Sequence, residues 1–174
     1  MSTLTEIEET VPALRRYAAS LLRQTQDADD LVQDCLVRAL DKLPSRNAEV
    51  PVKPWLFAIL HNLFINRWRK ARRWARILSD PGPDTPEIPV EASQEWSIAQ
   101  RDLLRGLNGL PEGQRQVLLL VGVEGLEYRE VAMILDIPIG TVMSRLSRAR
   151  DGLRDHMAGR AHQAAPRQTL RRVK

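Results

Sequence analysis

The sequence predicts an all-α protein made of two small helical bundles, joined by a linker rich in proline and acidic residues. Apolar residues recur at helical spacing along the chain, and no stretch shows the apolar–polar alternation of a strand. The segment 79–92 carries four prolines and four acidic residues with little to bury, as solvated linkers do. Beyond it, two helical segments separated by a short turn predict that the second bundle contains a helix-turn-helix.

Composition limits both the cores and the partners of the chain. Its 174 residues allow one domain or two small ones, and aromatic residues are only 5% of the total, so the cores must be mostly aliphatic. The net charge of +4 favours nucleic acid or another anionic partner. The charge is segregated, because residues 61–76 carry six cationic side chains and no acidic one.

The first bundle is predicted to consist of one helix over 11–22, a second over 28–43 and a third that begins near Trp55. The second of these has a predicted buried stripe, which comprises Val32, Leu36, Ala39, Leu40 and Leu43. Another face carries Asp30, Gln33, Asp34 and Asp41. Its carboxylates would repel DNA, so this face either meets a basic protein surface or only keeps the chain soluble. The lone Cys35 is expected to be a buried thiol in a reducing compartment.

The third helix is expected to begin at Pro54-Trp55, because proline suits the first turn of a helix. Three of its leucines can face the core, while an exposed stripe carries Asn62, Asn66, Arg69 and Arg73. Asparagine can hydrogen-bond base edges and arginine can neutralise phosphates, so this stripe could bind nucleic acid. The alternative is an ordinary solvated face. We expect Trp55 and Phe57 to be mainly core residues, and His61 to be a polar residue near the basic face.

The second bundle is predicted from helices over 96–107, 114–123 and 128–135, and a last helix that starts near Gly140. Asp136-Ile137-Pro138 breaks the last two apart, and Glu127 and Glu130 are expected to cap the earlier one or stay solvated. In the last helix an apolar stripe, comprising Val142, Leu146, Ala149 and Leu153, lies beside a polar stripe. This arrangement suits a recognition helix in a DNA major groove, the alternative being an amphipathic surface helix.

Several classes of function find no support in the sequence. We find no P-loop or glycine-rich phosphate motif, and the three histidines lack metal-ligand spacing, so we expect neither an enzyme nor a cofactor or metal. The N-terminus lacks the pattern of a signal peptide, and no apolar run approaches the length of a membrane span. We therefore expect a cytoplasmic protein without membrane insertion.

Three ordered motifs carry a family resemblance: DADDLVQDCLVRAL over 27–40, KPWLFAILHNLFINRWRK over 53–70, and a third over 110–154 that includes the helix-turn-helix. With a linker between the second and third, the chain resembles the extracytoplasmic-function (ECF) sigma factors of bacterial RNA polymerase. LRRYAASLLR and the first motif are also similar to the general-stress subgroup of alphaproteobacteria.

The resemblance implies three binding surfaces. The polymerase face, which would contact the β′ clamp, comprises Asp30, Gln33 and Asp34. The −10 face comprises Lys53, Asn62, Asn66, Arg67, Arg69, Lys70 and Arg73. Asn62 would lie near a captured −10 base, in a pocket formed with the help of the loop 44–53. The −35 face comprises Thr141, Ser144, Arg145 and Arg148.

The resemblance also implies a domain plan: 1–76 is a sigma region 2-like domain, 77–95 a flexible linker, 96–158 a region 4-like domain and 159–174 a disordered basic tail. The implied function is to direct core polymerase to promoters and nucleate their melting, in a stress or envelope response. The implied partners are core polymerase (β′ clamp and β flap), promoter DNA and an anti-sigma factor. The alternatives are a helix-turn-helix activator that never joins the polymerase, and an anchoring module with incidental basic faces.

Overall fold

The computed structural model describes residues 2–22, 25–77 and 98–164, and within these ranges all regular structure is helical. The fold class predicted from the sequence is thereby confirmed. Along the chain the helices are α1 (Thr3–Leu21), α2 (Thr25–Lys42), the 3-10 turn η1 (Leu43–Ser45), α3 (Val52–Ile77), α4 (Ile98–Asn108), α5 (Glu112–Gly122), α6 (Tyr128–Leu135) and α7 (Ile139–Ala164). The linker segment 79–92 lies outside the described residues.

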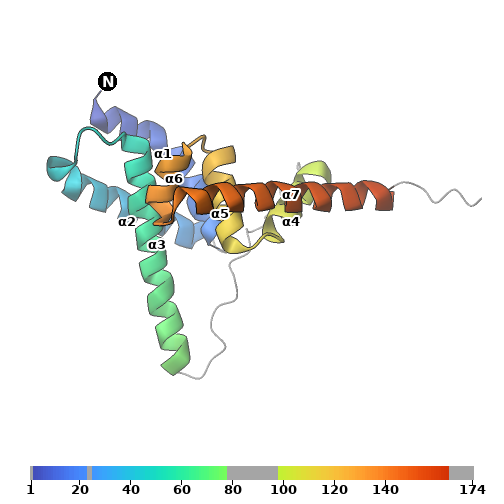
Figure 1. The fold of residues 1–174 in the computed structure, drawn as a ribbon. Helices are drawn as coiled ribbons and strands as arrows, with labels where there is room; N and C mark the ends of the chain where they lie inside the picture. Colours follow the sequence, from blue (N-terminus) through green and yellow to red (C-terminus); the bar gives the residue numbers. More distant parts are fainter. Residues whose placement is uncertain (1, 23–24, 78–97, 165–174) are drawn as a thin grey trace, which may run out of the picture.

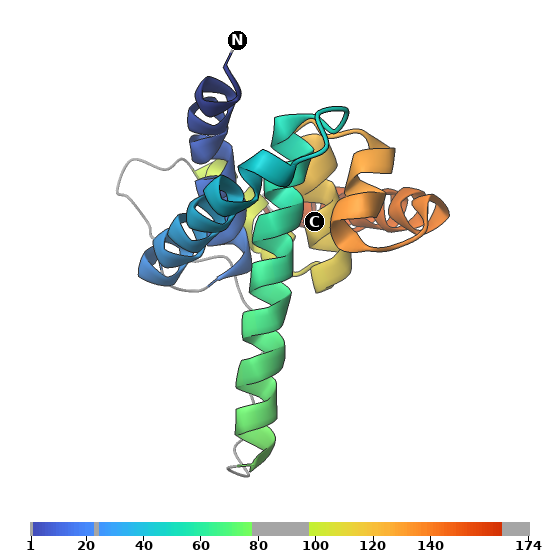
Figure 2. The same ribbon diagram turned by 90° about the vertical axis from the view of Figure 1, so that its left-hand side faces the viewer.

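In the first bundle α1, α2 and α3 pack against one another in all three pairs. Leu14, Leu31, Leu56 and Leu60 are fully buried between them, and so is Cys35, as predicted. The C-terminal half of α3 projects well beyond the other helices of the bundle (Figures 1 and 2). It therefore presents its cationic residues on a single helix that is open to solvent along most of its circumference.

The second bundle is built on α7, against which α4, α5 and α6 pack. Asp136 ends α6 in the left-handed conformation (φ 51°), and the Thr141 amide donates to the Pro138 carbonyl at 2.8 Å as α7 begins. Glu127 and Glu130 form a capping box at the start of α6, with the Glu127 amide 2.8 Å from Glu130 Oε2. Capping, rather than mere solvation, is therefore their role. The predicted helix-turn-helix is formed by α6 and α7.

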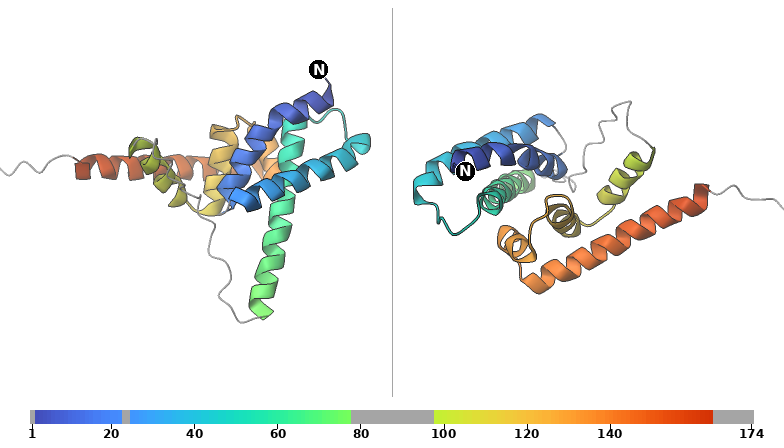
Figure 3. Two further views of the ribbon diagram at one scale, coloured as in Figure 1. Left: turned by 180° about the vertical axis from the view of Figure 1, so that it is seen from behind. Right: turned by 90° about the horizontal axis from the view of Figure 1, so that it is seen from above.

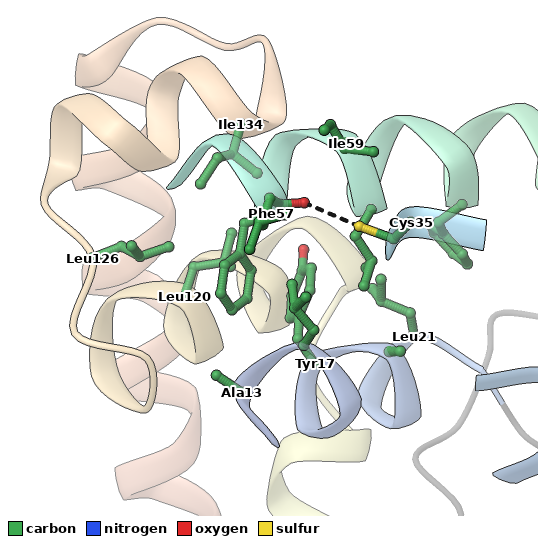
Figure 4. Packing of buried hydrophobic residues seen from close by; sticks show 14 of the residues in the cluster. Ala13, Tyr17, Leu21, Cys35, Phe57, Ile59, Leu120, Leu126 and Ile134 are labelled. Atoms are coloured by element: carbon green, nitrogen blue, oxygen red, sulfur yellow. Dashed lines mark hydrogen bonds between the residues drawn. The ribbon is translucent and has the colours of Figure 1, made fainter. Parts of the chain in front are cut away.

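The two bundles share one hydrophobic core. α6 packs on the N-terminal half of α3, and α3 lies between the other helices of the first bundle and the second bundle (Figure 3, right). In the close view, Tyr17 and Phe57 of the first bundle face Leu120 and Ile134 of the second (Figure 4). We call this contact the seam. It was not predicted from the sequence, which indicated two separate bundles.

Some boundaries and burial states differ from the predictions. α1 begins at Thr3, not at residue 11, although Pro12 lies inside it. Proline costs about 3 kcal/mol within a helix, so tertiary packing must stabilise the turns before it, in which Ile7 and Thr10 are buried. α7 continues to Ala164, into the segment predicted as a tail, and residues 165–174 lie outside the described part of the chain.

Two predictions about single residues were wrong. Leu40, expected in the buried stripe of α2, is 50% exposed. The stripe is narrower than predicted because Leu31 and Cys35, one turn apart, take the central core positions. His61, expected near the basic face, is buried and only 6% exposed. It lies on the side of α3 that faces Tyr17, whose hydroxyl is 3.4 Å from His61 Nδ1.

Candidate polymerase and nucleic-acid interfaces

The polymerase face lies on α2. Asp30, Gln33 and Asp34 are all exposed there, so the structure brings these three predicted residues together. Two aliphatic side chains continue the same stripe, with Val37 61% and Leu40 50% exposed. Neither was predicted from the sequence as a binding residue, although each lies seven positions, or two helical turns, after a polar member of the face. The face thus joins carboxylates to an uncovered apolar patch, the composition of a protein-binding surface.

An ion pair links the polymerase face to the −10 face. The Arg67 guanidinium of α3 contacts the Asp34 carboxylate of α2, and both side chains are well exposed. Exposed pairs of this kind are typically worth up to about 1 kcal/mol. The pair is therefore weak enough for a stronger partner of either side chain to replace it.

The −10 face occupies the projecting half of α3. Asn62, Asn66, Arg69, Lys70 and Arg73 are exposed along it. Trp74 lines a shallow hollow together with Asn66, Lys70 and Arg73. The Arg72 guanidinium lies 5.0 Å above the Trp68 ring. Exposed cations and indole rings on one helix can bind a nucleic-acid backbone and stack on its bases.

Lys53 is placed apart from the rest of the predicted −10 face. It lies in the first turn of α3, at the seam, and its ammonium donates to the Glu124 carbonyl at 2.6 Å. The loop before α3 is held by Arg46, which donates to the Val50 carbonyl and lies 5.7 Å from the centre of the Trp55 ring. Trp55 therefore supports the loop instead of entering the core fully.

The −35 face lies at the N-terminal half of α7. Ser144 and Arg148 are exposed, whereas Thr141 and Arg145 are half-buried. The Arg145 guanidinium lies against the backbone of α5, where a Cβ on Gly113 would come within 2.8 Å of Nη1. Arg148 is thus the freest cation of this face, and Arg145 is positioned by the neighbouring helix. In the apolar stripe behind them, Val142, Leu146 and Ala149 are buried, whereas Leu153 is half-buried.

Burial shifts the pKa values of three titratable groups in the core. It lowers the pKa of His61 to about 4 and raises the pKa of the Cys35 thiol to about 12. The pKa of Tyr17 is raised by burial and further by the charge of Glu112 across the seam, while Arg115 lowers it. His61 is therefore neutral at pH 7, and the Cys35 thiol is protonated and unreactive.

The described part of the chain shows neither a metal-binding cluster nor a membrane-spanning helix. Among those residues, no group of three or more His, Cys, Asp or Glu side chains could hold a metal ion. Over the same ranges, no helix combines the length and the apolar character that a membrane span needs.

Comparison with known proteins identifies both bundles. Residues 7–74 match the family profile of Sigma-70 region 2, and residues 100–152 match that of Sigma-70, region 4. The ECF RNA polymerase sigma factor EcfG of Rhodopseudomonas palustris is 36% identical over 148 residues, which is 85% of this chain and 81% of that protein. The ECF sigma factor SigW of Bacillus subtilis is 28% identical, over 79% of each chain.

A solved structure gives the same result. The sigma factor RpoE of Bartonella quintana, crystallised with the anti-sigma factor NepR, superimposes with a TM-score of 0.75 at 35% identity, covering 88% of this chain and 95% of that one. Sequence and fold therefore agree over both bundles. The chain belongs to the ECF family of RNA polymerase sigma factors.

Proposed function

We propose that this chain directs core RNA polymerase to promoters whose −35 and −10 elements it binds through α7 and α3. The observation that carries the proposal is the separation of three exposed faces by chemistry. α2 presents carboxylates with an apolar patch, and the projecting half of α3 and the start of α7 present cations. A protein partner with basic residues suits the first face, and DNA suits the other two.

The polymerase face would hold the chain on the β′ clamp. Asp30 and Asp34 would pair with basic clamp residues, while Val37 and Leu40 would be covered by apolar ones. A central apolar contact with a polar rim is the usual anatomy of a specific interface. Because Asp34 also pairs with Arg67, clamp binding would release the Arg67 guanidinium for the promoter backbone.

The −10 face would melt the promoter without covalent chemistry. Asn62 would read an extruded base, while Arg69, Lys70 and Arg73 would neutralise phosphates on the projecting helix. Extruding a base costs a few kcal/mol, and stacking on an aromatic ring returns about 1–3 kcal/mol per base. The hollow beside Trp74 offers one such ring. Capture of unpaired bases would thereby nucleate the transcription bubble.

The −35 face would dock on duplex DNA. Ser144 and Arg148 are open to a major groove, and the half-buried Arg145 and Thr141 lie at the edge of that surface. Two weak contacts on one polypeptide strengthen each other through effective concentration. Specific binding would therefore need both elements on one template.

We further propose that an anti-sigma protein controls this chain, in a cytoplasmic stress response. The relative from Bartonella quintana was crystallised with the anti-sigma factor NepR, which supports this proposal. The similarity to EcfG covers most of both proteins. The anti-sigma partner would compete with polymerase and DNA for the faces described above. Promoter activity should therefore rise with the concentration of the chain that is not bound to the anti-sigma partner.

Run-off transcription with purified core polymerase and a promoter library tests the proposal. The wild-type chain should start RNA synthesis only at templates with matched −35 and −10 elements. The double variant Asp30→Lys/Asp34→Lys should lose core binding, whereas Glu8→Lys, an exposed carboxylate on α1, should leave it unchanged. Specific duplex binding by the chain alone, with no initiation in the presence of core, would instead indicate an autonomous activator.

A further inference from the structure

The seam contains a buried carboxylate whose paired cations come from the opposite bundle. Glu124 lies in the turn between α5 and α6, and its side chain is only 2% exposed. Arg16 of α1 donates to both carboxylate oxygens, at 3.2 and 3.0 Å. Lys53 of α3 donates to the Glu124 carbonyl at 2.6 Å and lies 4.0 Å from Oε2. Both cations belong to the first bundle, whereas Glu124 belongs to the second.

The ion pair at Glu124 makes the contact between the two bundles specific. A buried carboxylate is tolerated only when it is paired and hydrogen-bonded, so loss of Arg16 should destabilise the seam. The apolar contact beside it, where Phe57 and Tyr17 meet Leu120 and Ile134, supplies adhesion but little directional preference (Figure 4). The ion pair therefore fixes the register in which the bundles close.

The closed arrangement cannot span a promoter. α6 packs on α3, and only the turn over 136–138 separates α6 from α7, so the −35 face starts beside the helix that carries the −10 face. The centres of the two elements, about 25 base pairs apart by their names, are separated by roughly 85 Å of duplex at 3.4 Å per pair. α7, with 26 residues, is only about 39 Å long. The bundles must part before both elements are bound.

We propose that Glu124 is a latch that keeps the free chain closed and that must release Arg16 and Lys53 before the promoter is engaged. Lys53 belongs to the predicted −10 face, so the closed form also withholds one promoter cation. Core polymerase, which would bind the two bundles at separate places, is the partner that opens the latch. This last step rests on the proposed function, but the closed state of the free chain does not.

Distance measurement on the full-length chain tests the latch. Nitroxide labels at Glu8→Cys on α1 and Ser147→Cys on α7, both exposed positions, report the separation of the bundles in a Cys35→Ser background. The labelled chain with Glu124, Arg16 and Lys53 intact should give one narrow distance distribution. Glu124→Lys should give a longer and several times broader one with unchanged helix content. Asp155→Lys, the same charge change on the exposed part of α7, should stay narrow.

A charge exchange separates a specific latch from general damage to the fold. Arg16→Glu alone should open the chain, and Arg16→Glu combined with Glu124→Arg should restore the narrow distribution. A narrow distribution in Glu124→Lys, a broad one in the unmodified chain, or no restoration by the exchange would each overturn the latch. Core polymerase should lengthen the distance in the unmodified chain. If it does not bind while the variants behave as expected, the proposed function fails and the latch stands.

Discussion

Acid should destabilise this protein through His61 by an amount that can be worked out from its burial. The side chain is 6% exposed, and burial lowers its pKa in the folded chain to about 4, from 6.5 in the unfolded chain. Between these two values the unfolded chain binds a proton that the folded chain does not. The free energy of unfolding therefore falls as the pH drops through this window, by about 3 kcal/mol in total at 1.36 kcal/mol per pH unit.

Urea unfolding followed by circular dichroism measures this loss. We would compare the wild type with His61→Gln at pH 7 and at pH 4, using the exposed neighbour Asn62→Gln as the matched control. Carboxylates also protonate on the way to pH 4, but they do so in all three proteins, so the difference between the curves isolates His61. His61→Gln should lose about 3 kcal/mol less than the wild type over this range. Parallel curves for all three proteins would refute the assignment of His61 as a buried neutral imidazole.

Four substitutions test other parts of the structure. Asp34→Asn should weaken binding to core polymerase yet tighten salt-dependent binding of the free chain to DNA, because it releases Arg67; weaker DNA binding in a filter assay would contradict this coupling. Val37→Asp should weaken the complex with core in a pull-down titration while leaving the thermal unfolding midpoint unchanged, since the side chain is 61% exposed. Arg148→Ala should reduce the affinity for −35 duplex by roughly 1–3 kcal/mol if it makes a bidentate base contact; equal losses on matched and scrambled duplexes would show a backbone contact instead. Leu120→Ala, at a fully buried position of the seam, should cost about 2–5 kcal/mol of unfolding free energy in urea titrations.

Much of the fold could be predicted from the sequence because helices depend on local pattern. The α6–turn–α7 unit is an example: apolar spacing indicated both helices, Asp136-Ile137-Pro138 indicated the break between them, and Glu127 and Glu130 were candidates to cap the first. The exposed positions of Asn66, Arg69 and Arg73 followed from the same periodicity. Within one helix, a residue's face is set by its angle of about 100° per residue, which the sequence states directly.

Burial was harder to predict where the core is formed by several helices. Leu40 carries an aliphatic side chain at a plausible core position, yet half of it is exposed because Leu31 and Cys35 take the central core positions of α2. His61 is polar, yet it is buried because Tyr17 approaches that side of α3. Neither outcome depends on the residue's own segment. Both depend on how α1, α2 and α3 pack together.

The sequence by itself determined the all-α class, the helix-turn-helix and the separation of acidic and basic faces, since each follows from residues a few positions apart. Only the tertiary structure decided that the two bundles close on each other. Arg16 and Glu124 are 108 positions apart, and no periodicity links them. Their pairing requires complementary apolar surfaces around the ion pair. Burial of a carboxylate is tolerated only where a cation and hydrogen-bond donors are already in position. That complementarity exists between folded surfaces and has no local signature in the chain.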